Sequence, residues 1–122
     1  MTFDQHIGMT YSDSFDEAKI ETEAHHLNPT GNINGGVLIS LADNLATGVA
    51  SHHWREKTGG NAFLVGVDLH AVMLTNQMGG TITAKAEPVR VGKRIVIIRT
   101  SVYGDGDRLL AEITSTHVPV TN

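Results

Sequence analysis

The stretch from His26 to Ala50, HLNPTGNINGGVLISLADNLATGVA, decides the fold of this 122-residue chain. It joins a glycine-bearing turn to a segment whose apolar residues cover most of a helix circumference, which is more than one amphipathic stripe. A helix of this kind must be surrounded by other elements on most of its sides. The sequence therefore predicts a buried helix from Gly36 to about Lys57, ending before the turn signal Thr58-Gly59-Gly60.

Polar residues interrupt the apolar run at spacings of three and four, so they share one narrow seam of the helix. They are Ser40, Asp43, Asn44, Thr47 and Ser51. Asp43 is the only charged residue inside the run. A carboxylate there loses hydration unless it is paired, hydrogen-bonded or open to a cleft, and such groups are over-represented at functional sites. Asp43 is therefore a catalytic candidate, with a solvated edge residue as the alternative.

The turn Asn34-Gly35-Gly36 leads directly into the helix. The first amide N–H groups of a helix have no intrahelical partner, and together with the helix dipole they attract negative charge. Glycine also allows a ligand to approach the backbone closely. This combination suits an oxyanion that develops when a carbonyl is attacked, although a plain tight turn has the same sequence pattern.

Alternating apolar and polar residues dominate the rest of the chain and predict strands. The expected strands are Ala18 to His25, Ala62 to Thr75, Gly80 to Val89, Arg94 to Tyr103 and Leu109 to Val118, with a hairpin signal at Gly104-Asp105-Gly106. One helix followed by a run of antiparallel strands predicts an α+β domain, in which a curved antiparallel sheet of about five strands wraps round a long central helix.

The helix and its leading turn resemble the signature of a known family. The residues that carry the resemblance are Asn28, Gly31, Gly35, Gly36, Leu41 and Asp43. They resemble hotdog-fold acyl-CoA thioesterases of the phenylacetate-degradation and hydroxybenzoyl-CoA type, although Asn34 stands where that family usually has His. The resemblance continues through VGVDLHA (Val65 to Ala71) and EPVRVGKR (Glu87 to Arg94). It implies a single hotdog domain over residues 1–122 that hydrolyses aryl or medium-chain acyl-CoA thioesters.

The resemblance also implies roles for individual residues. Asp43 is the expected nucleophile or general base, the Gly35 N–H polarises the thioester carbonyl, and Asn28 positions the reacting groups. Gly36 and Asn34 belong to the loop around the carbonyl, while Asn44, Thr47, His70 and Met73 are expected near the acyl group. The basic cluster Arg90, Lys93 and Arg94, which flanks Gly92, is expected to bind the phosphates of coenzyme A.

The spacing of these parts predicts an assembly. Gly35 and Asp43 are eight residues apart, which is about 12 Å along a helix. Both cannot contact one reacting carbonyl from the same helix, because a base and an oxyanion donor must each lie within about 3 Å of the reacting atoms. A two-fold homodimer with antiparallel central helices brings Asp43 of one chain to Gly35 of the other. Similar proteins pair such dimers into homotetramers.

Other classes of protein fit the sequence poorly. A net charge of −4 argues against nucleic-acid binding, and the absence of cysteine excludes disulfides and a thiolate nucleophile. His25-His26 and His52-His53 lack the spacing of a metal site, so we expect no metal and no cofactor beyond the coenzyme A of the substrate. No stretch predicts a membrane span or signal peptide, which favours the cytoplasm. His117 is expected to be structural or exposed.

Two alternative functions share the hotdog scaffold. Asn28-Pro29 is reminiscent of hotdog enoyl-CoA hydratases, but His26 and Gly31 stand where that motif needs Asp and His. A non-catalytic acyl-CoA-binding protein is the other alternative. It is suggested by Asn34 and by the stretch Met73 to Asn76, where related thioesterases often carry more polar or aromatic residues.

Overall fold

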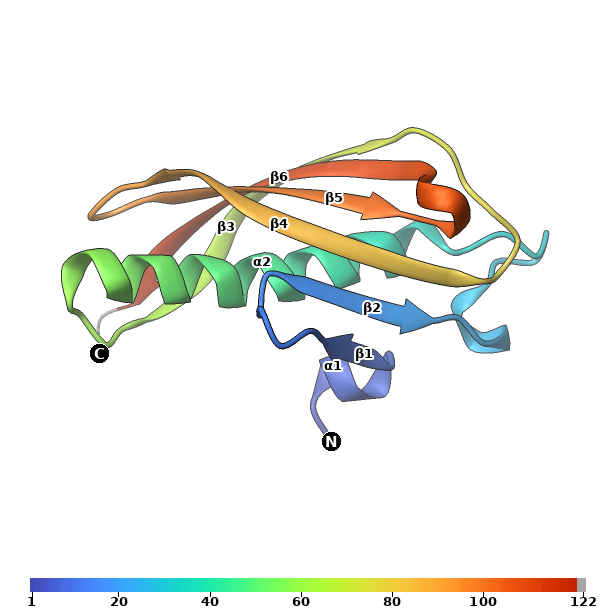
Figure 1. Cartoon of the computed structure of the whole chain (residues 1–122), viewed down its shortest axis with the longest axis horizontal. Coiled ribbons are helices and arrows are strands. Elements are labelled where there is room, and N and C mark those ends of the chain that lie inside the picture. The colour runs from blue at the N-terminus through green and yellow to red at the C-terminus, as the bar shows by residue number, and fades with distance from the viewer. Residues whose placement is uncertain (121–122) are drawn as a thin grey trace.

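A computed structural model describes residues 1–120 of the chain. Its strands form one antiparallel sheet in the order β1-β2-β4-β5-β6-β3, which curves over the long helix α2 (Figure 1). In chain order the elements are α1 (Phe3–His6), β1 (Met9–Tyr11), β2 (Glu17–Glu21), the 3-10 helix η1 (Ala24–His26), α2 (Gly35–Thr58), β3 (Phe63–Met73), β4 (Thr81–Val91), β5 (Val96–Tyr103), the 3-10 helix η2 (Asp105–Asp107) and β6 (Leu109–Val120).

Helix α2 has a defined start and stop. The side chain of Asn34 caps its beginning by accepting a hydrogen bond of 2.8 Å from the Gly36 N–H. At its end Gly59 adopts the left-handed conformation, with φ of 72°, and its N–H bonds the Arg55 carbonyl. The helix thus extends the predicted range by one residue at each end. Among the described helices, none is long and apolar enough to cross a membrane.

The core lies between α2 and the concave face of the sheet. Alternate residues of the strands turn toward the helix, as the period of two requires, and they include Ile82, Ile98 and Ile113, each fully buried. From the helix they meet Leu38, Leu41 and Leu45. A helix enclosed by a curved antiparallel sheet is the hotdog arrangement, so the predicted fold class is confirmed.

The N-terminal region differs from its prediction. A sixth strand, β1, pairs with β2 at the sheet edge, where we expected only a lead-in. The strand expected to reach His25 ends at Glu21, and the chain then forms η1. The buried His26 ring stabilises this change of direction, because its Nδ1 accepts from the Glu23 N–H at 2.9 Å and its Nε2 lies 2.8 Å from the Ile7 carbonyl.

Strand β3 is a long edge strand that, within residues 1–120, pairs only with β6. Apolar side chains project from it into solvent, namely Val65, Val67, Leu69, Val72 and Met73. Most proteins protect such an edge, because its unpaired N–H and C=O groups accept another strand. A strand of eleven residues that has a free edge and several exposed apolar side chains is therefore typical of an interface.

Candidate active site

Asp43 lies half-buried on α2, beside an open hollow of about 450 Å³. The hollow is lined by residues of α1, α2 and β3: Phe3, Ile39, Ser40, Asp43, Asn44, Gly66, Val67, Asp68 and Leu69. The carboxylate is thus held by a buried helix and is open to a small molecule at the same time. Of the three alternatives expected for a charge within an apolar run, which were pairing, hydrogen bonding and an open cleft, the structure shows the cleft.

Gly66 on β3 makes room beside the carboxylate. A Cβ atom at this position would lie 3.5 Å from Asp43 Oδ1 and 3.7 Å from Nδ1 of His117. The absence of a side chain therefore leaves a small space that the carboxylate and the histidine ring share. Glycine inside a strand often marks such a close approach.

The start of α2 presents a second polar group. Asn34 accepts from the Gly36 N–H through its side chain and from the Val37 N–H through its carbonyl. The Gly35 N–H, by contrast, has no hydrogen-bond partner within residues 1–120. A Cβ on Gly35 would lie 3.3 Å from Met73 Cε, so Met73 of β3 lies against the helix start. Gly35 thus offers an unused donor at the positive end of a helix dipole.

Asn28 shapes the turn ahead of the helix. Its Oδ1 accepts from the Thr30 N–H at 3.0 Å, the Thr30 hydroxyl at 2.6 Å and the Asn32 N–H at 3.2 Å. Its Nδ2 group has no partner in the described part of the chain, so the two amide hydrogens remain available as donors. The turn therefore fixes the side chain while its donating end can position a carbonyl.

Within one chain the predicted site residues fall into separate groups. Asn34, Gly35 and Met73 meet at the start of α2, whereas Asp43 and Asn44 line the hollow two turns along the helix. Thr47 is half-buried further along α2 and His70 is exposed on β3, and both lie outside the lining of the hollow. One chain thus does not bring the predicted catalytic residues Asp43 and Gly35 into one hollow.

The basic turn between β4 and β5 is held by its backbone. The Trp54 indole donates to the Lys93 carbonyl at 2.9 Å, and the Gly92 N–H donates to the Ile95 carbonyl at 2.9 Å. The side chains of Arg90, Lys93 and Arg94 are exposed, and within residues 1–120 they have no salt bridge. Val96, which follows the turn, pairs with His117, and His117 pairs with Gly66. The basic turn therefore leads into the sheet close to the Asp43 hollow.

Some residues of this region were missed by sequence reasoning. Gly66, Asp68 and Phe3 line the hollow. His117 is fully buried, which agrees with the structural alternative that we expected for it and contradicts the exposed one. A glycine within the predicted strand Ala62 to Thr75 was one available signal. Another was the alternation of β6, which places Ser115 and His117 on the same face as Ile113.

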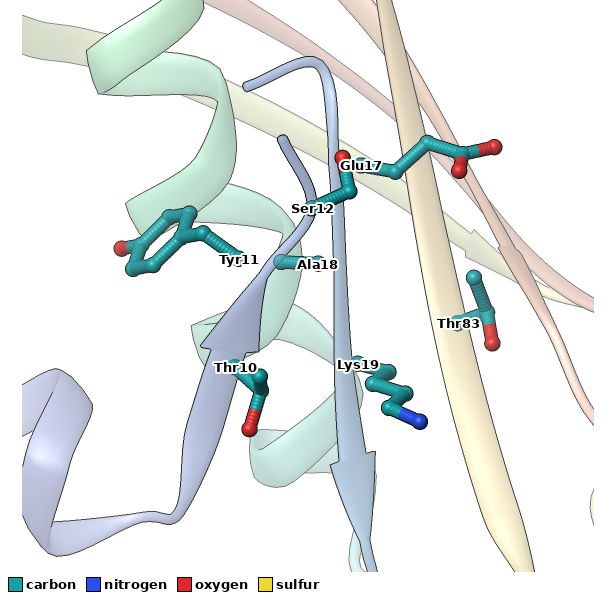
Figure 2. Close-up of a pocket in the computed structure, with 7 residues that line it drawn as sticks. All are labelled: Thr10, Tyr11, Ser12, Glu17, Ala18, Lys19 and Thr83. Atoms are coloured by element: carbon teal, nitrogen blue, oxygen red, sulfur yellow. The ribbon is translucent and has the colours of Figure 1, made fainter. Parts of the chain in front are cut away.

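A smaller hollow of about 100 Å³ lies between β1 and β2 and is shown in Figure 2. It is lined by Thr10, Tyr11, Ser12, Glu17, Ala18, Lys19 and Thr83, none of which is a predicted site residue. Across residues 1–120, no group of three His, Cys, Asp or Glu side chains is placed to hold a metal ion. The Asp43 hollow is the candidate active site because two predicted site residues, Asp43 and Asn44, line it.

Comparison with known proteins identifies the family. The model of the thioesterase superfamily matches residues 30–111, from the turn ahead of α2 into β6. This chain belongs to the thioesterase superfamily. Membership confirms the resemblance seen in the sequence and supports thioester hydrolysis as the general class of activity.

One sequence relative and two solved structures show what the chain is similar to in sequence and in fold. The chain is 29% identical over 82 residues to "Putative esterase ComA2" of Bacillus subtilis (strain 168), covering 67% of this chain and 63% of that protein. The structure of a "putative esterase Rv1847/MT1895" from Mycobacterium tuberculosis has a TM-score of 0.89 at 21% identity, covering 98% of this chain and 97% of the other. The BH2602 protein of Bacillus halodurans, solved with CoA, has a TM-score of 0.81 at 20% identity, covering 92% and 71%.

Proposed function

We propose that this protein hydrolyses acyl-CoA thioesters, with aryl or medium-chain acyl groups, to a free acid and coenzyme A. The observation that carries the proposal is the Asp43 carboxylate, half-buried on α2 and open to a hollow of about 450 Å³. Superfamily membership and the CoA bound to the Bacillus halodurans relative support it. Asp43 activates water as a general base or attacks the thioester carbonyl itself.

The developing oxyanion needs a donor that the protein does not already use. The Gly35 N–H meets this condition, because it is unpaired in the described chain and lies at the start of α2. In the ground state it polarises the carbonyl, and in the transition state it stabilises the negative oxygen. Asn28 donates from its Nδ2 group to hold the carbonyl or the attacking water.

These groups require two chains. Gly35 and Asp43 are about 12 Å apart along the straight axis of α2. We propose that the exposed edge of β3 pairs with the same edge of a second chain around a two-fold axis, which covers its apolar side chains and sets the two α2 helices antiparallel. Asp43 of one chain then meets Gly35 of the other, and the dimer contains two equivalent sites. Further pairing into a tetramer is part of the proposal.

The substrate would lie across the interface between the two chains. Arg90, Lys93 and Arg94 bind the phosphates of coenzyme A, since they are exposed and lack carboxylate partners within residues 1–120. Asn44, Thr47, His70 and Met73 contact the acyl group from α2 and β3. Apolar pockets discriminate a methylene by only about 1–3 kcal/mol, so we expect broad acyl selectivity.

Thiol release from a panel of aryl- and medium-chain acyl-CoA substrates tests this function. Asp43→Asn should lower kcat by at least about 10³-fold with little loss of stability, because it removes the group that activates the nucleophile. Asp68→Asn, which alters another carboxylate in the same hollow, should lower kcat less than tenfold. Near-normal turnover by Asp43→Asn would refute the role of Asp43. Tight binding without thiol release would favour the non-catalytic alternative, and loss of enoyl absorbance without thiol release would favour a hydratase.

A further inference from the structure

His117 is a buried histidine that the proposed reaction does not yet use. Its ring lies on the face of β6 that packs against α2, and none of its surface is exposed. Nε2 lies 2.8 Å from the hydroxyl oxygen of Ser115, which is also buried. Nδ1 has no hydrogen-bond partner within residues 1–120. A buried polar atom without a partner is rare in native proteins and requires an explanation.

The position of Gly66 explains why Nδ1 of His117 has no partner within residues 1–120. Nδ1 of His117 and Oδ1 of Asp43 both lie within 3.7 Å of the point where a Gly66 Cβ would stand. Asp43 is the charged group whose field acts on His117. The residues that pair with His117 in the sheet, Gly66 on β3 and Val96 on β5, carry no charge. The unpartnered nitrogen and the proposed catalytic carboxylate therefore flank the same point beside Gly66.

The hydrogen-bonding rules fix the direction of each bond. An ionised carboxylate only accepts, so a ring nitrogen that serves it must carry a hydrogen. A neutral imidazole with a hydrogen on Nδ1 has an accepting Nε2, and the Ser115 hydroxyl can donate to it. Burial lowers the pKa of His117 below its ordinary value, with the Asp43 charge opposing this in part, so the ring is neutral at pH 7.

We propose that His117 is a positioning residue for Asp43: the Ser115 hydroxyl donates to Nε2, and Nδ1–H donates toward the Asp43 carboxylate through one water at Gly66. This bond orients the carboxylate toward the thioester. The proposal rests on the proposed function for its kinetic consequences, but not for the state of the ring itself.

Histidine tautomers test the state of the ring without any substrate. His26 is an internal control, because its Nδ1 accepts from the Glu23 N–H and its Nε2 therefore donates to the Ile7 carbonyl. In the ¹⁵N-histidine-labelled protein at pH 8, His26 should have its hydrogen on Nε2 and His117 on Nδ1. Asp43→Asn should shift the His117 ring signals and leave those of His26 in place. An Nε2–H tautomer for His117, or His117 signals unaffected by Asp43→Asn, would overturn the proposal.

Paired substitutions test the kinetic consequence. His117→Asn places an amide donor near the position of Nδ1, whereas His117→Gln places it near Nε2. We expect His117→Gln and His117→Leu to lower kcat by about 10- to 100-fold with KM changed less than twofold, and His117→Asn to retain most of the activity. A hydrogen bond to the charged carboxylate favours ionisation. Its loss should therefore move the acid limb of the kcat profile to higher pH.

A purely structural role would lower the stability of all three variants without moving the acid limb, and that result would also overturn the proposal. If the wild-type protein releases no thiol from acyl-CoA, the proposed function fails, while the tautomers of His26 and His117 still decide the role of His117.

Discussion

Gly66→Ala is the substitution whose effect the structure specifies most closely. The added methyl carbon would lie 3.5 Å from Asp43 Oδ1 and 3.7 Å from His117 Nδ1, which are ordinary contact distances. The backbone therefore need not move, and Gly66 does not have a positive φ that would penalise alanine. Alanine also reduces the conformational freedom of the unfolded chain, so the free energy of unfolding should change by less than about 1 kcal/mol and in the stabilising direction.

The effect on turnover should be large. A water bound to Asp43 Oδ1 from the side of Gly66 would lie about 2.8 Å from that oxygen. The new methyl carbon occupies this space at 3.5 Å from the same oxygen. The variant thus displaces the water and separates His117 from the carboxylate. Misplacement on this scale costs roughly 10²-fold in kcat, or about 2.7 kcal/mol of transition-state stabilisation.

Gly48→Ala is the matched control. Gly48 lies on the same helix as Asp43, is exposed, and has nothing within 4 Å of its added Cβ. It should raise the free energy of unfolding by up to about 1 kcal/mol and leave kcat unchanged. Thermal unfolding and thiol release on both variants make the comparison. Wild-type kcat in Gly66→Ala would refute the account of this space, and a large loss of stability would refute the packing on which it rests.

Two further predictions concern the nucleotide end and the pH dependence of stability. Replacing both Lys93 and Arg94 with Ala should raise KM for acyl-CoA about tenfold or more, because only the phosphates of the substrate meet these side chains. KM for a truncated thioester without the nucleotide should stay unchanged. Equal effects on the KM of both substrates would contradict this prediction. Burial lowers the pKa of His117 in the folded protein. Just below about pH 6.5 the unfolded chain therefore binds more protons than the folded chain does. The free energy of unfolding should fall as the pH drops through that range. Urea unfolding of His117→Leu at a fixed protein concentration should show a shallower fall than the wild type, and identical slopes would contradict the prediction.

The central helix and the sheet could be predicted because their signals are periodic and local. The apolar run after Gly36 required enclosure, and α2 is enclosed by the sheet. Strand β1 was missed because its three residues, Met9–Tyr11, are too few to show a period and depend on pairing with β2. The early end of β2 depends on His26, whose ring bonds to the distant Ile7 carbonyl.

In the candidate site, too, the residues with a local sequence signal could be predicted and the contacts between distant elements could not. Asp43 could be singled out as a lone charge in an apolar run, and Gly35 as a glycine at a helix start. Asp43 and His117 both lie near Gly66, and the three residues come from elements far apart in the sequence, so no local pattern predicts this arrangement. Asn34 was predicted to bind substrate, and this stays a prediction, while the structure shows that its side chain caps α2 through the Gly36 N–H.

The central claim, that each site takes Asp43 from one chain and Gly35 from another, has a direct test. Gly35→Pro removes the N–H at the first position of α2, which tolerates proline, and Asn34 already has the extended conformation that precedes proline, with φ of −61° and ψ of 129°. Gly35→Ala, which keeps the N–H, is its control. Asp43→Asn and Gly35→Pro chains should each be inactive alone.

Thiol release by a co-expressed one-to-one mixture of these two chains is the deciding measurement. Half of randomly assembled dimers pair one chain of each kind, and each such dimer contains one site with both Asp43 and the Gly35 N–H intact, so about a quarter of the wild-type activity should return. A mixture as inactive as its components would contradict the shared site.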